Sequence, residues 1–123
     1  MAQRRVIAIV DDDALIRESL KDLLDSAGYS SVVFSSAQRF LKSKSLTRCA
    51  CLITDMRMPG TTGLELYQKL IAAGHAIPTI LITAYPDDTV RARAVSAGIR
   101  CYLPKPVTSD ALLACVDEAL EAP

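Results

Sequence analysis

The sequence predicts an α/β fold in which one parallel five-stranded sheet has helices on both faces. Short apolar runs alternate with amphipathic stretches along the chain, and "VIAIV" (6–10) is continuously apolar and β-branched, as a strand covered on both faces is. The length of 123 residues, with 50% hydrophobic and 23% charged residues, suits one domain with one core. We therefore expect a single domain over residues 1–123, with its core at about 6–120.

The first half of the chain predicts three strands and two helices. After strand 6–10, an apolar stripe marks a helix that Gly28 terminates: Ile16, Leu20, Leu23, Leu24 and Ala27. "SVVF" (31–34) is a short strand, and Ser35 with Gln38 forms a capping-box pattern that opens a second helix. "ACLIT" (50–54) is the third strand.

The second half continues the alternation. Thr62 and Glu65 form a capping box for a helix that ends near Gly74, and "IPTILIT" (77–83) is the fourth strand. Residues 87–97 form a helix with few apolar side chains, which predicts weak packing. A short strand lies in "RCYLPKP" (100–106), and a last helix carries Leu112, Leu113, Val116 and Leu120, with Thr108 or Ser109 as its cap. Right-handed crossovers then favour a parallel sheet.

Charge and hydropathy exclude several functional classes. Fourteen Lys and Arg balance fourteen Asp and Glu, without a block of like charge, so we expect no direct nucleic-acid contact by this chain. No apolar run approaches the roughly 20 residues of a membrane span, and the N-terminal apolar run is too short for a signal peptide. We expect a cytoplasmic protein without membrane contact.

The four cysteines match no paired zinc spacing. They are Cys49, Cys51, Cys101 and Cys115. In a chain long enough to build its own core, such residues are most often small buried hydrophobes, and we expect that role here, with a redox role for Cys49 and Cys51 as the lesser alternative.

Charged and hydroxyl side chains follow the predicted strands at one end. In open parallel sheets, ligands bind outside the carboxyl ends of the strands, and in the order 2-1-3-4-5 that point lies between the first and third strands. The side chains expected to meet there are Asp11, Asp12, Asp55, Thr83 and Lys105. Asp13 fits better as a helix N-cap.

Three crowded carboxylates repel one another unless a cation holds them. Mg²⁺ (or Mn²⁺) fits this set better than zinc, because it prefers oxygen ligands and is usually held by one or two carboxylates with phosphate oxygens. The set then predicts phosphoryl transfer, with Asp55 as the attacking carboxylate, Asp11 and Asp12 as metal ligands, and Thr83 and Lys105 pairing with phosphoryl oxygens.

Four short blocks carry a family resemblance. "VDDD", "ITDMRMPG", "ILITA" and "YLPKP" resemble, in order and spacing, the signature blocks of the response-regulator receiver domain of two-component signalling. The likeness extends from about Val6 to about Leu120. It implies the flavodoxin-like, CheY-like (βα)5 fold and a phosphoacceptor that a histidine kinase phosphorylates.

Residue by residue, the resemblance implies these roles. Asp11, Asp12 and Asp55 hold the metal together with the backbone carbonyl of Arg57, and Asp55 accepts the phosphoryl group. Thr83 is the switch hydroxyl, Tyr102 the switch aromatic and Lys105 the phosphate-pairing lysine, which a cis bond to Pro106 orients. From local sequence alone, Tyr102 also fits an ordinary core aromatic.

The chain further resembles FixJ-type receivers, which often precede a helix-turn-helix domain that controls transcription. It is then either a stand-alone receiver or a piece of a longer regulator, and a homodimer through the fourth helix, fifth strand and fifth helix is an expected partner arrangement. The chain departs from the common pattern at Pro104 and Val107, and Arg57 and Tyr85 occupy positions that tune phosphoryl lifetime in this family.

Two other functions compete with a phosphorylated receiver. A degenerate receiver would bind partners without phosphorylation, but all five site residues are present. A small phosphatase of the haloacid-dehalogenase type would need a second acid two residues after Asp55, where this chain has Arg57. The expected chemistry is self-phosphorylation and self-dephosphorylation within a signalling protein, not that of an enzyme with its own substrate.

Overall fold

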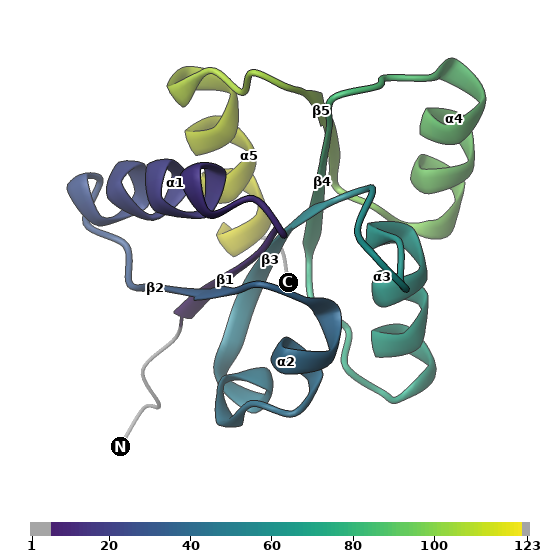
Figure 1. Cartoon of the computed structure of the whole chain (residues 1–123), viewed down its shortest axis with the longest axis horizontal. Helices are drawn as coiled ribbons and strands as arrows, with labels where there is room; N and C mark the ends of the chain where they lie inside the picture. Colours follow the sequence, from purple (N-terminus) through teal and green to yellow (C-terminus); the bar gives the residue numbers. More distant parts are fainter. Residues whose placement is uncertain (1–5, 122–123) are drawn as a thin grey trace.

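Five parallel strands form the centre of the computed structural model, which describes residues 6–121 (Figure 1). Their order is β2-β1-β3-β4-β5, as the sequence predicts. The strands are β1 (Val6–Val10), β2 (Ser31–Phe34), β3 (Cys49–Asp55), β4 (Thr79–Thr83) and β5 (Cys101–Pro104). The chain adds β2 on one side of β1 and β3 on the other, so the point where the strand order reverses lies between β1 and β3, at their carboxyl ends.

Helices cover both faces of this sheet. They are α1 (Ala14–Ser26), α2 (Ala37–Leu41), α3 (Gly63–Ala72), α4 (Asp88–Ala97) and α5 (Ser109–Glu121). A 3-10 segment, η1 (Lys44–Arg48), precedes β3. Figure 1 shows α1 and α5 on one face, and α2, α3 and α4 on the other. Among residues 6–121, no helix is both long and apolar enough to cross a bilayer.

The side-chain alternation of β1 explains its continuous apolar sequence. Ile7 and Ile9 pack in the cluster that contains residues of α1 and α5, whereas Ala8 and Val10 pack in the cluster of α2 and α3. All five residues of β1 are buried. A strand with helices on both sides has no face for polar side chains, which is the reason for the apolar run.

Side-chain caps set the helix starts. The Asp13 carboxylate accepts a hydrogen bond from the Leu15 amide at 2.9 Å, which confirms its N-cap role. Thr62 and Glu65 form the predicted capping box. The prediction for α2 was wrong by one residue, because Ser36, not Ser35, accepts from the Arg39 amide. Thr108 accepts from the Ala111 amide and caps α5.

Helix α4 is weakly packed, as its sequence predicts. Ala94 is its one buried residue, and Val95 remains 58% exposed. The helix is held at its start by the Asp87 carboxylate, which accepts from the Val90 amide at 3.0 Å. An element that buries so little apolar surface can shift at low cost.

Gly63, at the start of α3, lies directly behind the end of β3. A Cβ atom at this position would clash with the backbone oxygen of Asp55 and would come within 2.7 Å of the Leu81 side chain. The close approach of helix and strand therefore requires glycine here.

We predict that Gly63→Ala lowers the free energy of unfolding by about 1–3 kcal/mol, because the added methyl group meets backbone that cannot yield. Urea unfolding checks this, with Gln68→Ala on the exposed side of α3 as the control. Equal stability of Gly63→Ala and wild type would show that β3 and α3 can separate without cost.

Candidate functional site

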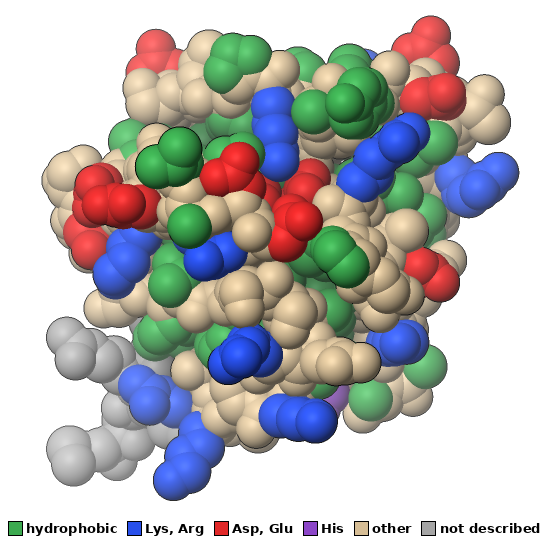
Figure 2. All heavy atoms as spheres, in the orientation of Figure 1, with side chains coloured by type: hydrophobic (Ala, Val, Ile, Leu, Met, Phe, Trp, Pro, Cys, Tyr) green, Lys and Arg blue, Asp and Glu red, His purple; other side chains and the backbone are tan. Residues whose placement is uncertain are grey.

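The carboxyl ends of four strands bring the predicted side chains together. Asp11 follows β1, Asp55 and Thr83 are the last residues of β3 and β4, and Lys105 follows β5. Figure 2 shows acidic side chains gathered near the middle of the visible face, next to a basic one. Asp11, Asp55 and Thr83 are nearly inaccessible, with exposed fractions of 0, 6 and 1%. The site is thus a group of mostly buried side chains at the carboxyl edge of the sheet.

Lys105 joins the two buried carboxylates. Its Nζ lies 3.2 Å from Asp11 Oδ2 and 3.2 Å from Asp55 Oδ1. The backbone amide of Lys105 donates to the Thr83 carbonyl at 2.7 Å, which continues the pairing of β5 with β4. The peptide bond to Pro106 is cis, as the resemblance implied. The ammonium group therefore lies between carboxylates that would otherwise repel one another.

The pKa values reflect this balance of burial and pairing. Burial raises the pKa of Asp11 above its usual 3.8, and the neighbouring Asp55 adds to the rise, against hydrogen bonds from the Asp13 amide and Lys105. Burial by itself would lower the pKa of Lys105, but its contacts with Asp11 and Asp55 outweigh burial and raise it. The lysine is thus held in its charged form, while ionised Asp11 is costly.

The carboxylates form a possible cation site. Asp11, Asp12 and Asp55 each offer an oxygen, and these oxygens lie within 4.8 Å of one another. Asp12 is exposed, whereas the other two are buried. A set of hard oxygen ligands, one of them exposed to solvent, fits a small divalent cation that keeps some of its waters.

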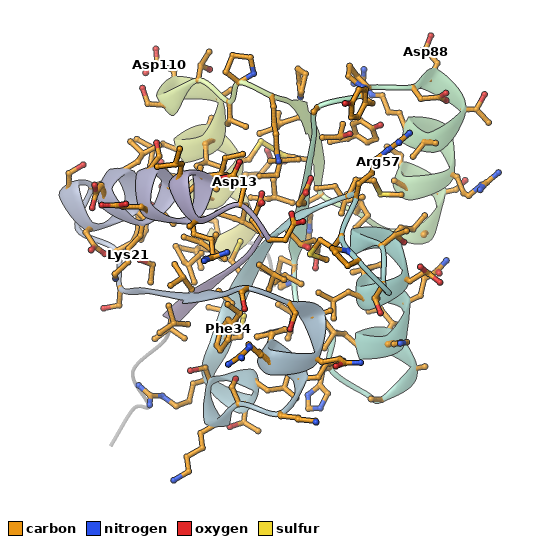
Figure 3. All side chains as sticks on the ribbon, viewed as in Figure 1. Asp13, Lys21, Phe34, Arg57, Asp88 and Asp110 are labelled. Carbon is orange, nitrogen blue, oxygen red and sulfur yellow. A yellow bond between two sulfur atoms is a disulfide. The ribbon has the colours of Figure 1, made fainter. Side chains whose placement is uncertain are left out.

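Two further contacts hold Asp11 in place. The Asp13 amide donates to Asp11 Oδ1 at 2.9 Å, and the Arg17 guanidinium donates to the Asp11 carbonyl at 2.7 Å. Sequence reasoning missed Arg17, because an arginine on the first turns of a helix gives no local sign that it reaches back to the preceding strand. Figure 3 shows Asp13 at the start of α1, beside the site.

Thr83 and Tyr102 lie on neighbouring strands, β4 and β5. The Thr83 hydroxyl accepts from the Tyr85 amide at 3.1 Å. Tyr102 is half-buried, packs beside the cluster of α3, α4 and β4, and accepts from the Asp87 amide at 3.2 Å through its hydroxyl. Tyr102 therefore links β5 to the start of α4 and is not a fully buried core residue.

Two loops meet beside the pocket. The Arg57 guanidinium carbon lies 4.8 Å from the centre of the Tyr85 ring, which is a cation–π contact between the loop after β3 and the loop after β4. Figure 3 shows Arg57 on the first of these loops. The sequence marked both residues separately but gave no sign that they touch.

The expectation that all four cysteines are unpaired hydrophobes was wrong for two of them. Cys101 and Cys115 form a disulfide between β5 and α5, with their Cα atoms 6.4 Å apart. The sequence gave no sign of this pairing, because the two cysteines are 14 residues apart and meet only when α5 packs beside β5. Cys49 and Cys51 are free, and burial raises their pKa values to about 11 and about 12.

We predict that Asp11→Asn stabilises the metal-free protein at pH 7, by on the order of 1 kcal/mol, because it removes a carboxylate that is costly to ionise. The folded-state pKa of Asp11 is raised, so the wild type loses stability as the pH rises from 3.8 through that pKa, and the variant does not. The difference in the free energy of unfolding between the variant and the wild type should therefore grow as the pH rises and become constant below 3.8.

Urea unfolding in a chelator across this pH range makes the measurement. The control is Asp13→Asn, which exchanges one good N-cap for another at an exposed position and should leave stability nearly unchanged. A less stable Asp11→Asn protein at pH 7 would mean that the Lys105 pair outweighs the cost of burial.

Comparison with known sequences gives a family for this arrangement. The family model of the response regulator receiver domain matches residues 7–117. The chain is 35% identical over 120 residues to the transcriptional regulatory protein FixJ of Bradyrhizobium diazoefficiens, covering 98% of this chain and 58% of FixJ. It is 39% identical over 119 residues to the response regulator protein TmoT of Ectopseudomonas mendocina, covering 97% of this chain and 54% of TmoT.

Solved structures of response regulators have the same fold as this chain. The response regulator StyR superimposes with a TM-score of 0.89 at 39% identity, over 97% of this chain and 60% of StyR. FixJ-N superimposes with a TM-score of 0.86 at 28% identity, over 99% of this chain and 98% of that chain. The chain spans little more than half the length of the two curated relatives. By sequence and by fold, it belongs to the receiver-domain family of two-component response regulators.

Proposed function

We propose that this receiver accepts a phosphoryl group on Asp55, from a sensor histidine kinase or a small acyl phosphate, in a reaction that requires Mg²⁺ (or Mn²⁺). The observation that supports it best is the position of Lys105, whose ammonium lies 3.2 Å from the carboxylates of both Asp11 and Asp55. A cation held there can pair with a phosphoryl oxygen as soon as the group arrives.

In the proposed reaction, a carboxylate oxygen of Asp55 attacks phosphorus and the bond from phosphorus to the donor's nitrogen or oxygen breaks. Asp11, Asp12 and Asp55 would hold the metal with the backbone carbonyl of Arg57. When bound, the metal would neutralise charge on the phosphoryl oxygens. Lys105 would pair with one such oxygen, and the burial of the site limits access of water to the acyl phosphate.

The same phosphoryl group would act as the switch. Thr83, at the end of β4, would donate its hydroxyl to a phosphoryl oxygen and move inward. Tyr102 could then leave the Asp87 amide and follow into the space that Thr83 vacates, and the weakly packed α4 would adopt a new position. The output is a changed surface over α4, β5 and α5.

This surface would mediate homodimer formation or another protein contact. The setting we propose is the cytoplasm, where residues 1–123 act as one receiver domain of a transcription-controlling regulator whose output part lies outside this chain. The chain itself would not contact nucleic acid. Its chemistry would be limited to its own phosphorylation and dephosphorylation.

Acetyl phosphate tests the phosphoryl acceptance directly. We predict that the intact mass of the wild type rises by one phosphoryl group when Mg²⁺ is present and stays unchanged in chelator. Asp55→Asn should show no gain, because its amide is not a nucleophile of this kind.

Asp12→Asn provides a graded comparison, since it should weaken Mg²⁺ binding without removing the acceptor Asp55. Its phosphorylation should therefore need a higher Mg²⁺ concentration. Circular dichroism establishes that each variant is folded. If folded wild-type protein gains no phosphoryl group, this receiver acts as a binding module without phosphorylation; a gain that persists in Asp55→Asn would move the acceptor to another residue.

Thr83→Ala separates phosphorylation from switching. We predict that the variant still gains the phosphoryl group but no longer shows the change in hydrogen exchange over residues 86–97 that phosphorylation produces in the wild type. The physical reason is that the methyl side chain cannot donate to the phosphoryl oxygen. An unchanged exchange response in Thr83→Ala would assign the signal to another group at the pocket.

A further inference from the structure

The Cys101–Cys115 disulfide closes a covalent loop around the part of the chain that carries the switch. The two cysteines are 14 residues apart, and Tyr102 and Lys105 lie between them. One end of the loop is the first residue of β5, and the other lies in the middle of α5. The bond therefore ties the strand that holds the switch aromatic to the helix beside it.

The reactivity of the four cysteines differs with their surroundings. Cys101 and Cys115 are both half-buried at the edge of the cluster shared by α1, α5 and the sheet, and their sulfur atoms are bonded to each other. Burial raises the pKa of the Cys49 thiol to about 11 and that of the Cys51 thiol to about 12, which keeps both protonated at neutral pH and poorly reactive. The geometry thus joins Cys101 to Cys115 and leaves Cys49 and Cys51 as free thiols.

The cellular compartment proposed above also favours a disulfide that forms reversibly. Disulfides are rare in reducing compartments, and those that do form there are usually transient and redox-sensing. In the cytoplasmic setting proposed above, this bond would open and close with the thiol balance of the cell and would not be a permanent cross-link.

We propose that Cys101 and Cys115 form a reversible redox switch that, when oxidised, restrains the loop from β5 to α5 and opposes the phosphorylated arrangement of the receiver. In the oxidising step, the two thiols lose two protons and two electrons to a low-molecular-weight disulfide such as oxidised glutathione, which leaves as two thiols. Excess reduced glutathione reverses the step. The effect on the switch rests on the proposed phosphorylation of Asp55.

The direction of the effect follows from the state in which the bond exists. Here the disulfide coexists with a Tyr102 hydroxyl that accepts from the Asp87 amide, the arrangement that precedes switching. In the proposal, the covalent link next to Tyr102 favours this arrangement over the phosphorylated one. The coupling is reciprocal, so phosphorylation should also make the pair harder to oxidise.

Thiol counting tests bond formation independently of any phosphorylation. Protein treated with oxidised glutathione is denatured and alkylated without reductant; two labels are expected, against four after full reduction. Peptide mapping should place the bond between Cys101 and Cys115. Four labels, or a stable glutathione adduct without ring closure, would overturn the proposal.

Hydrogen exchange tests the restraint. Amides of residues 102–114 should exchange more slowly in the oxidised than in the reduced wild type, and Cys115→Ala should show the reduced behaviour under both treatments. Cys49→Ala, which removes a cysteine outside the pair, should keep the difference. Equal exchange in the oxidised and reduced wild type would overturn the restraint.

Binding of beryllofluoride, a phosphoryl mimic, tests the coupling by calorimetry with Mg²⁺ present. The oxidised wild type should bind several-fold more weakly than the reduced wild type, and the difference should vanish in Cys115→Ala but remain in Cys49→Ala. Equal affinity in the two redox forms would overturn the coupling. Failure of both forms to bind would instead contradict the proposed function, and the restraint would still be decided by thiol counts and exchange.

Discussion

The charge balance around Lys105 is the constraint on which the site depends. Two carboxylates that are almost inaccessible to water lie against one ammonium, and that ammonium belongs to the residue after the edge strand β5, which β3 and β4 separate from β1. Buried charges persist only when they are paired, so the fold must bring β1, β3 and β5 into register before the pocket can exist. Burial, together with the neighbouring Asp55, still raises the pKa of Asp11, so its ionised form remains costly despite the contact with Lys105. The remaining cost leaves the pocket suited to a divalent cation and a phosphoryl group.

The rest of the molecule divides into a rigid part and a movable part. The central strands are buried on both faces, and Gly63 lets α3 pack directly on the end of β3. Helix α4 is different, since it buries little and is connected to β5 through the contact of Tyr102 with Asp87. A rigid pocket next to a loosely packed helix is the arrangement in which a small change at the site can move a surface.

Much of the fold was predictable because its signals are local. The apolar run of β1, the helical stripe of α1 and the Thr62–Glu65 capping box each arise from residues close in sequence. The predicted cap of α2 was wrong by one residue, since Ser35 and Ser36 are adjacent and either side chain can accept from an amide of the first turn. The meeting of Asp11, Asp55, Thr83 and Lys105 was also predictable, because parallel strands end at one edge of a sheet.

The alternation of strands and helices, the residues that follow the strand ends and the weakness of α4 could be predicted, since periodicity and strand ends are recorded in neighbouring residues. The strand order followed from the fold class and from the family resemblance of the four signature blocks. Three contacts became evident in the folded molecule alone: Arg17 reaches back to Asp11, Arg57 lies over Tyr85, and Cys101 pairs with Cys115. Each of these contacts joins side chains from separate elements, and their distance depends on how helices and loops pack against the sheet, which no local pattern records.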